Sequence, residues 1–187
     1  LPLRDLVGNR SIRRVYIASG LQLFAAGALP AWLPSYFNRY YHLPVDRAGA
    51  LAAALLLICG VGMILCGMLA DRLARERPEA KITLAIGYCL ATALCLSLAM
   101  LLPPGPAQLL LFGFTMFFVA GTVGPVGAMV ANLTPLAIHG SAFGTLTLEN
   151  NLLGLAPGPI LTGCIADALG LAEAIRILAA PCVASAL

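Results

Sequence analysis

Apolar stretches of about 20 residues recur along this chain and constrain its fold more than any other feature. A helix needs about 20 residues to cross roughly 30 Å of hydrocarbon, and lipid offers no partner to an open backbone. Hydrophobic residues make up 60% of the 187 residues and charged residues only 10%, a composition far from that of a water-soluble domain. The sequence therefore predicts an all-α, multi-pass integral membrane protein.

Six segments qualify as transmembrane helices, the last of them incompletely. Their approximate bounds are Ile12–Phe37, Ala48–Ala70, Ile82–Leu102, Gln108–Leu133, Ser141–Ala166 and Ala172–Leu187. The sixth has only sixteen residues, and the chain opens on Leu1 instead of an initiator methionine. We expect residues 1–187 to be one transmembrane bundle within a longer polypeptide.

Lysine and arginine are concentrated on one predicted side of the membrane. Eight of them lie before the first span or between the second and third: Arg4, Arg10, Arg13, Arg14, Arg72, Arg75, Arg77 and Lys81. The opposite side carries two, Arg39 and Arg47. Because cytoplasmic loops are enriched in basic residues, we expect the first group to face the cytoplasm. The net charge of +3 thus indicates topology and contact with membrane lipid, with no nucleic-acid partner.

Aromatic side chains cluster where the first span leaves the membrane on the other side. They are Trp32, Tyr36, Phe37, Tyr40 and Tyr41. Tryptophan and tyrosine gather at headgroup depth, so we expect interfacial anchors that bind no ligand.

Motifs for catalysis or metal binding are lacking in the sequence. None of the six cysteines forms a C-x-x-C pair or lies at metal-ligand spacing from a histidine. There is no G-x-S-x-G or H-E-x-x-H motif, and His42 and His139 fall in predicted loops on opposite sides of the membrane, where we expect no special role for them. We expect no metal and no cofactor, and an intramembrane enzyme remains only as an alternative.

The two halves of the chain resemble each other at an offset near 96 residues. Gly67 and Asp71 at the end of the second span match Gly163 and Asp167 at the end of the fifth. Two units of three spans each must lie inverted in the membrane, as in secondary transporters. The sequence therefore predicts two inverted three-helix repeats, with chance similarity between apolar helices as the alternative.

The segment Gly67–Arg77 reads GMLADRLARER and combines a packing residue with charges. Gly67 permits close approach of a neighbouring helix, and Asp71 can accept hydrogen bonds from that helix's backbone N–H groups. Arg72 and Arg75 can bind carboxylates or lipid headgroups. Such a segment would latch one conformation, unless Asp71 is only a solvated counter-charge in a basic loop.

GMLADRLAR resembles the loop motif of the major facilitator superfamily, G-x-x-x-D-R-x-G-R-R. Ala74 stands at the second glycine, and Glu76 interrupts the basic pair. A second stretch looks like helices ten and eleven of Spinster-like members. It comprises Ala131–Pro135, His139–Ala142, Asn151–Gly154, Gly158–Pro159, Gly163 and Asp167, with His139 where arginine is usual and Asn132 where glutamine is frequent.

This resemblance covers nearly the whole chain and implies the carboxy-terminal six-helix half of a transporter. Its expected function is secondary active transport by alternating access, as symport or antiport, with proton coupling as one option. The cargo would be a small organic or an amphipathic, lipid-like solute. The missing amino-terminal six-helix half would be its partner, and a bacterial cytoplasmic membrane its location. A non-transporting membrane fragment or scaffold is the alternative.

Glu149 is the clearest ionisable group at membrane depth. It lies eight residues after Ser141, about 12 Å into the hydrocarbon, where a charge costs at least about 2.5 kcal/mol. Asn150 and Asn151 follow directly, so at least one of three polar side chains must face protein or water. We expect Glu149 to contact protons or cargo, or to hydrogen-bond another helix.

Weaker candidates for the transport pathway are Gln22, Asn38 and Asn132, for each of which a helix-to-helix hydrogen bond is an equal alternative. Pro125 and the run Pro157-Gly158-Pro159 remove backbone donors within the fourth and fifth spans. We therefore expect kinks in both of these helices.

Overall fold

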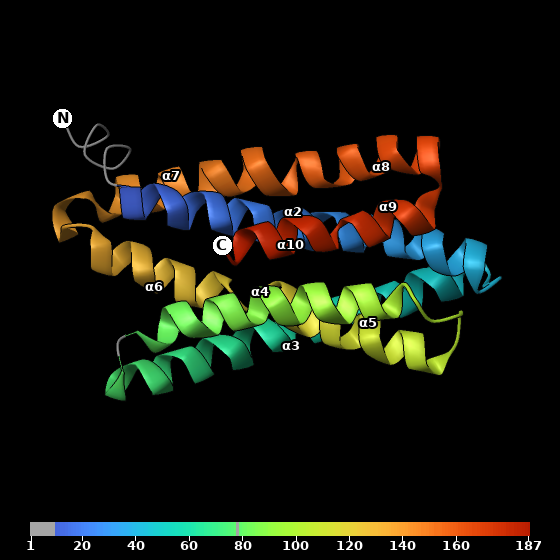
Figure 1. Ribbon diagram of the computed structural model, residues 1–187, viewed down its shortest axis with the longest axis horizontal. Coiled ribbons are helices and arrows are strands. Elements are labelled where there is room, and N and C mark those ends of the chain that lie inside the picture. The colour runs from blue at the N-terminus through green and yellow to red at the C-terminus, as the bar shows by residue number, and fades with distance from the viewer. Residues whose placement is uncertain (1–9, 78) are drawn as a thin grey trace.

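The computed structural model describes residues 10–77 and 79–187, and these form a bundle of helices without a strand (Figure 1). Arg4 lies outside the described residues, as does Pro78. The elements are α2 (Arg10–Tyr40), α3 (Val45–Glu76), α4 (Ala80–Ala99), α5 (Pro106–Val119), α6 (Val123–Leu133), η1 (Leu136–Ile138), α7 (His139–Glu149), η2 (Asn150–Leu155), α8 (Pro157–Leu169), α9 (Leu171–Ile177) and α10 (Ala179–Ser185).

Five continuous or bent helical segments are long and apolar enough to cross a membrane. They are Arg10–Tyr40, Val45–Arg75, Ala80–Ala99, Pro106–Leu133 and Leu136–Leu169. These confirm the first five predicted spans, each within a few residues. The sixth predicted span folds as two helices of seven residues, α9 and α10, which run back along α2 (Figure 1).

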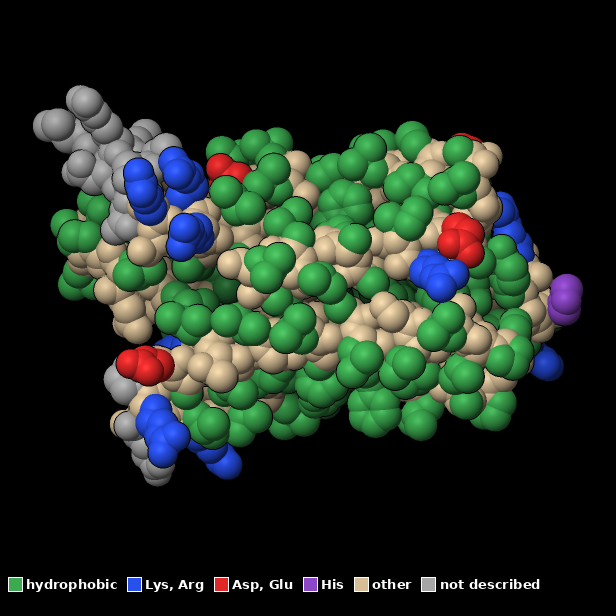
Figure 2. Space-filling model, viewed as in Figure 1, with side chains coloured by type: hydrophobic (Ala, Val, Ile, Leu, Met, Phe, Trp, Pro, Cys, Tyr) green, Lys and Arg blue, Asp and Glu red, His purple; other side chains and the backbone are tan. Residues whose placement is uncertain are grey.

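Apolar side chains cover the middle of the visible face, and charged ones gather toward its two ends (Figure 2). Helix α3 illustrates the exposure, since Leu57 is 74% and Ile64 60% accessible. Water would not tolerate so large an exposed apolar surface, whereas lipid does. The described residues therefore form an integral, multi-pass membrane bundle.

Span four is broken, as its proline predicted. Helix α5 ends at Val119, residues 120–122 form a turn, and Pro125 lies in the first turn of α6. Proline has no N–H to give to the carbonyl four residues back, so it fits best near the start of a new helix.

The predicted aromatic anchors are wrong for Tyr36 and Phe37, which lie in the protein core. Their rings pack against Phe112 of α5 at centroid distances of 5.6 and 5.9 Å. Trp32 is half-buried and donates its indole N–H to the Pro159 carbonyl at 2.9 Å. Only Tyr40 is exposed among these rings, because α5 and α8 cover the others.

A buried polar node closes the same end of the bundle. Gln108 is 1% exposed and donates its amide to the Ala99 carbonyl at 2.9 Å and to the Tyr36 hydroxyl at 3.0 Å. Tyr41 donates its hydroxyl to Gln108 Oε1 at 2.7 Å. Burial raises the pKa of Tyr41, so its hydroxyl remains a donor at neutral pH. The node joins α2 to the connection between α4 and α5.

We expect Gln108→Leu to lower the free energy of unfolding by about 2–3 kcal/mol, because it leaves several buried partners without a hydrogen bond. Thermal or denaturant unfolding in mild detergent measures the change. Asn38→Ala is the control at the same end, because it removes one exposed bond, to the Leu43 carbonyl, and should cost under about 1 kcal/mol. Equal losses in the two variants would contradict a special role of the node.

Candidate functional site

Span five changes from α- to π-helix directly after Glu149. Helix η2 (Asn150–Leu155) is a π-helix, and the Ala156 N–H donates to the Asn151 carbonyl at 3.0 Å, five residues back. Pro157, which has no N–H to donate, then begins α8. The irregularity predicted from Pro157-Gly158-Pro159 is thus confirmed, although it takes the form of a π-helical segment. Such segments are rare and occur frequently at functional sites.

The Glu149 face of α7 consists of Ala142, Leu146 and Glu149, which lie on one side of the helix because they are four and three residues apart. Ala142 and Leu146 are buried in a small core shared with α2 and α6, whose other members are Ile12, Tyr16, Val126 and Val130. The Tyr16 hydroxyl donates to the Ala142 carbonyl at 3.0 Å. This bond joins α2 to α7 two turns before Glu149.

Glu149 itself is half-buried. It forms neither of the ion pairs found in residues 10–77 and 79–187, which are Lys81–Asp71 and Arg176–Glu173. It lies ten residues, or about 15 Å, from the start of α7 at His139. The carboxyl group therefore lies within an apolar segment and has no ion-pair partner among the described residues.

The two asparagines after Glu149 differ in their hydrogen bonding. Asn151 is exposed and donates its amide to the Thr147 carbonyl at 2.8 Å, within its own helix. Asn150 is half-buried, and its Oδ1 is buried without a hydrogen-bond partner in the described part of the chain. A buried acceptor without a donor is unfavourable, so Asn150 joins Glu149 as a group with unused hydrogen-bonding capacity.

The remaining pathway candidates do not converge on Glu149. Gln22 is fully buried and hydrogen-bonds Thr92 of α4 and the Val119 carbonyl of α5. Asn132 is exposed near the end of α6. The side chain of Asn38 is exposed and bonds the Leu43 carbonyl at 2.8 Å. Of the six candidate residues, the structure groups only Glu149, Asn150 and Asn151, which are adjacent in sequence.

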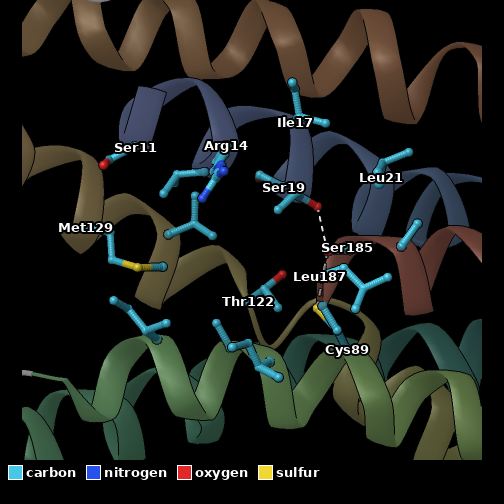
Figure 3. A pocket seen from close by; sticks show the side chains of 18 residues that line it. Ser11, Arg14, Ile17, Ser19, Leu21, Cys89, Thr122, Met129, Ser185 and Leu187 are labelled. Atoms are coloured by element: carbon cyan, nitrogen blue, oxygen red, sulfur yellow. Dashed lines mark hydrogen bonds between the residues drawn. The ribbon is translucent and has the colours of Figure 1, made fainter. Parts of the chain in front are cut away.

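A cavity of about 630 Å³ lies elsewhere, between α2, α4, α6 and the last residues of the chain (Figure 3). Its lining is mostly apolar, with Arg14, Ser19 and Thr122 among the polar groups. At one end Ser185 donates its hydroxyl to the Ala18 carbonyl at 2.7 Å and lies 3.3 Å from Cys89 Sγ. None of the predicted site residues lines this cavity.

The predicted latch segment lies at the end of α3. A Cβ added to Gly124 of α6 would lie 3.2 Å from Gly67 Cα, whereas one added to Gly67 would meet nothing within 4 Å, so the close approach of the two helices depends on Gly124 and not on Gly67. Asp71 forms an ion pair with Lys81 of α4 at 3.5 Å, not the predicted bonds to backbone N–H groups. Arg72 and Arg75 are exposed. Adjacent turns of α3 thus contact α6 and α4.

We expect Asp71→Asn to change the free energy of unfolding by less than about 1 kcal/mol, because its side chain is 71% exposed and exposed ion pairs contribute little. A latch would instead show as a changed distribution between transport conformations. Thermal unfolding and protease accessibility of the native protein, with Asp46→Asn as an exposed control on the same helix, measure both quantities. A large loss of stability would show that Asp71 is structural.

Sequence reasoning missed the role of His139. It is half-buried, and its Nε2 lies 3.1 Å from the Ala131 carbonyl and 3.0 Å from the Thr134 carbonyl, at the end of α6. A ring N–H there bonds carbonyls that the helix end leaves unpaired. The expectation of an exposed loop histidine with no role is therefore wrong. The sequence signal for this role is the position of His139, five residues after Thr134, which caps the C-terminus of α6.

Metal-binding residues do not cluster in the described part of the chain. No group of three histidine, cysteine, aspartate or glutamate side chains there could hold an ion. The six cysteines are unpaired. The candidate site is therefore Glu149 with its neighbours Asn150 and Asn151, in an apolar bundle with two irregular spans.

Comparison with known proteins agrees with this architecture. Residues 2–187 match the Major Facilitator Superfamily. A protein of Haemophilus influenzae named "Putative metabolite transport protein" is 24% identical over 182 residues. The match covers 96% of this chain and 42% of that protein, so the chain spans less than half the length of the relative. This chain belongs to the major facilitator superfamily, a family of membrane transporters and not of enzymes.

Proposed function

We propose that this chain is the carboxy-terminal half of a secondary active transporter that moves a small organic or amphipathic solute by alternating access. The observation that carries the proposal is Glu149, a half-buried carboxyl group at the transition from α7 to η2 without an ion-pair partner among the described residues. Membership of the superfamily supports it. An ionisable group within a span is costly, and it is retained where it serves ions, protons or cargo.

The chemistry of the Glu149 face favours proton coupling. Acidic side chains within spans serve as proton relays in pumps and transporters. Asn150 provides an adjacent acceptor for cargo or for a donor from another helix. The finer proposal is that the cargo is lipid-like. It is based on the residues between Ala131 and Asp167 that resemble Spinster-like members.

The remaining elements of the proposal concern assembly. Two inverted three-helix repeats would pack against an amino-terminal six-helix half, and rocking between the halves would expose Glu149 to each side in turn. Gly67, Asp71, Arg72 and Arg75 would latch one of these states on the cytoplasmic side. A bacterial cytoplasmic membrane, with its lipid as a partner, is the proposed location.

Reconstituted flux tests the proposal. The native protein in proteoliposomes should accumulate radiolabelled solutes from a panel of organic anions, amphiphiles and lysolipids when a proton gradient is imposed. Collapse of the gradient with a protonophore should abolish accumulation and leave exchange intact. If no solute in the panel moves, while the protein is folded and correctly inserted, a non-transporting scaffold becomes the better account.

A further inference from the structure

The turn between α5 and α6 leaves a backbone carbonyl without its usual donor. In an uninterrupted helix the Val123 N–H would bond the Val119 carbonyl, but here it bonds Ala120 at 3.2 Å. The turn lies in the interior, since Val119, Gly121 and Thr122 are buried. A buried carbonyl without its usual donor needs another hydrogen-bond partner.

Gln22 of α2 supplies that donor. Its Nε2 lies 3.1 Å from the Val119 carbonyl and 3.2 Å from Thr92 Oγ1 of α4, which engages both of its hydrogens. Thr92 in turn donates to the Tyr88 carbonyl at 2.7 Å. Because Gln22 is fully buried, the amide joins three spans inside the protein.

A second helix supports the same turn. Cys66 of α3 packs against it, since a Cβ added to Gly121 would lie 3.0 Å from Cys66 Sγ. The Gln22 Oε1 atom, by contrast, is buried without a partner in the described residues. The Gln22 amide thus forms hydrogen bonds only through its N–H groups. A donor is what the free Val119 carbonyl requires.

The bend between α5 and α6 determines where α6 lies relative to Glu149. Val126 and Val130 of α6 pack with Tyr16 and Leu146 in the small core beside the Glu149 face. A change in the bend would shift these valines and with them the packing around the carboxyl group. The hydrogen bond from Gln22 to the Val119 carbonyl therefore lies just before the start of α6, and the Glu149 face packs against residues further along the same helix.

We propose that Gln22 is a positioning residue: its amide fixes the bend of the fourth span and thereby the position of α6 beside Glu149. This replaces a direct role in the transport pathway for Gln22. This inference rests on the proposed function only where it concerns the role of Glu149 in transport, because the bend itself can be measured without any cargo.

Spin-label distances across the break test the proposal. Labels at Phe114 of α5 and Leu133 of α6, both exposed, report the bend in a protein whose accessible cysteines, Cys59, Cys95 and Cys164, are replaced by alanine. The buried Cys66, Cys89 and Cys182 are kept, because Cys66 packs against the turn. Gln22→Met keeps the size of the side chain and removes the donor, so the distance distribution should become at least twice as wide. Gln108→Met is the matched control, because it alters the other fully buried glutamine and should leave this distribution unchanged.

Rescue separates hydrogen bonding from packing. Gln22→Glu in its neutral form keeps one donor and should restore the narrow distribution at acidic pH, which Gln22→Met cannot do. If Gln22→Met does not fold, Thr92→Val removes one partner and should broaden the distribution more weakly. A distribution in either variant identical to that of the parent would overturn the proposal, whereas loss of flux with an unchanged bend would count only against the proposed function.

Discussion

Replacing Glu149 by glutamine should reduce uptake driven by a proton gradient at least tenfold and remove its dependence on pH. The amide has the shape of the carboxyl group but cannot exchange a proton, so a site that couples through Glu149 loses its driving force. Solute exchange without a gradient should persist, because exchange requires only that the site alternate. The measurement is initial uptake in proteoliposomes across several external pH values.

Glu173→Gln is the matched control for this experiment. Glu173 lies in the first turn of α9, is exposed, and pairs with Arg176 at 3.6 Å. The substitution removes one negative charge, as Glu149→Gln does, but outside the Glu149 face. It should therefore leave the pH profile of uptake unchanged. An unaltered pH profile in Glu149→Gln would exclude a coupling role and leave Glu149 as a hydrogen-bond partner of another helix.

Gly62→Ala should lower the free energy of unfolding by about 3 kcal/mol or prevent insertion of a folded bundle. A Cβ at Gly62 would overlap the Phe117 carbonyl oxygen and lie 2.7 Å from the Phe117 Cα. The obstruction is backbone, which cannot rotate away as a side chain can, so α3 and α5 must separate. Unfolding in mixed detergent micelles measures the loss.

Gly60→Ala controls for the change in helix propensity. Gly60 lies on the same helix, two residues earlier, and a Cβ there would meet nothing within 4 Å. Alanine is the better helix former by about 1 kcal/mol, so this variant should be neutral or slightly stabilised. Similar stability of the two variants would show that α3 and α5 do not pack at Gly62 as closely as described.

The fold was largely predictable because lipid imposes one solution on each apolar segment. The prolines at 125 and 157 also indicated the irregular spans, since a missing N–H acts locally. The prediction failed for Tyr36 and Phe37, which lie in the core. They are aromatic residues near the end of a span, as interfacial anchors are, and only the packing of α5 against α2 buries them.

The candidate site was predictable only in part. Glu149 was selected as a candidate because a charge at membrane depth is costly wherever the helix points. Gln22 was equally visible as a polar residue in a span, yet its direction is set by the break at Val119 and by Thr92. Nothing in a local pattern distinguishes a glutamine that faces a pathway from one that bonds a distant carbonyl.

The sequence by itself determined that this chain is a membrane bundle, where its first five spans lie, and that the fourth and fifth are irregular. These properties follow from hydrophobicity and from proline, which act within about 20 residues of chain. Only the tertiary structure decided that Asp71 pairs with Lys81, that His139 bonds the end of α6, and that Gln22 holds the turn after Val119. Each of these contacts joins helices through space, and its partner is fixed by helix packing and not by the order of residues.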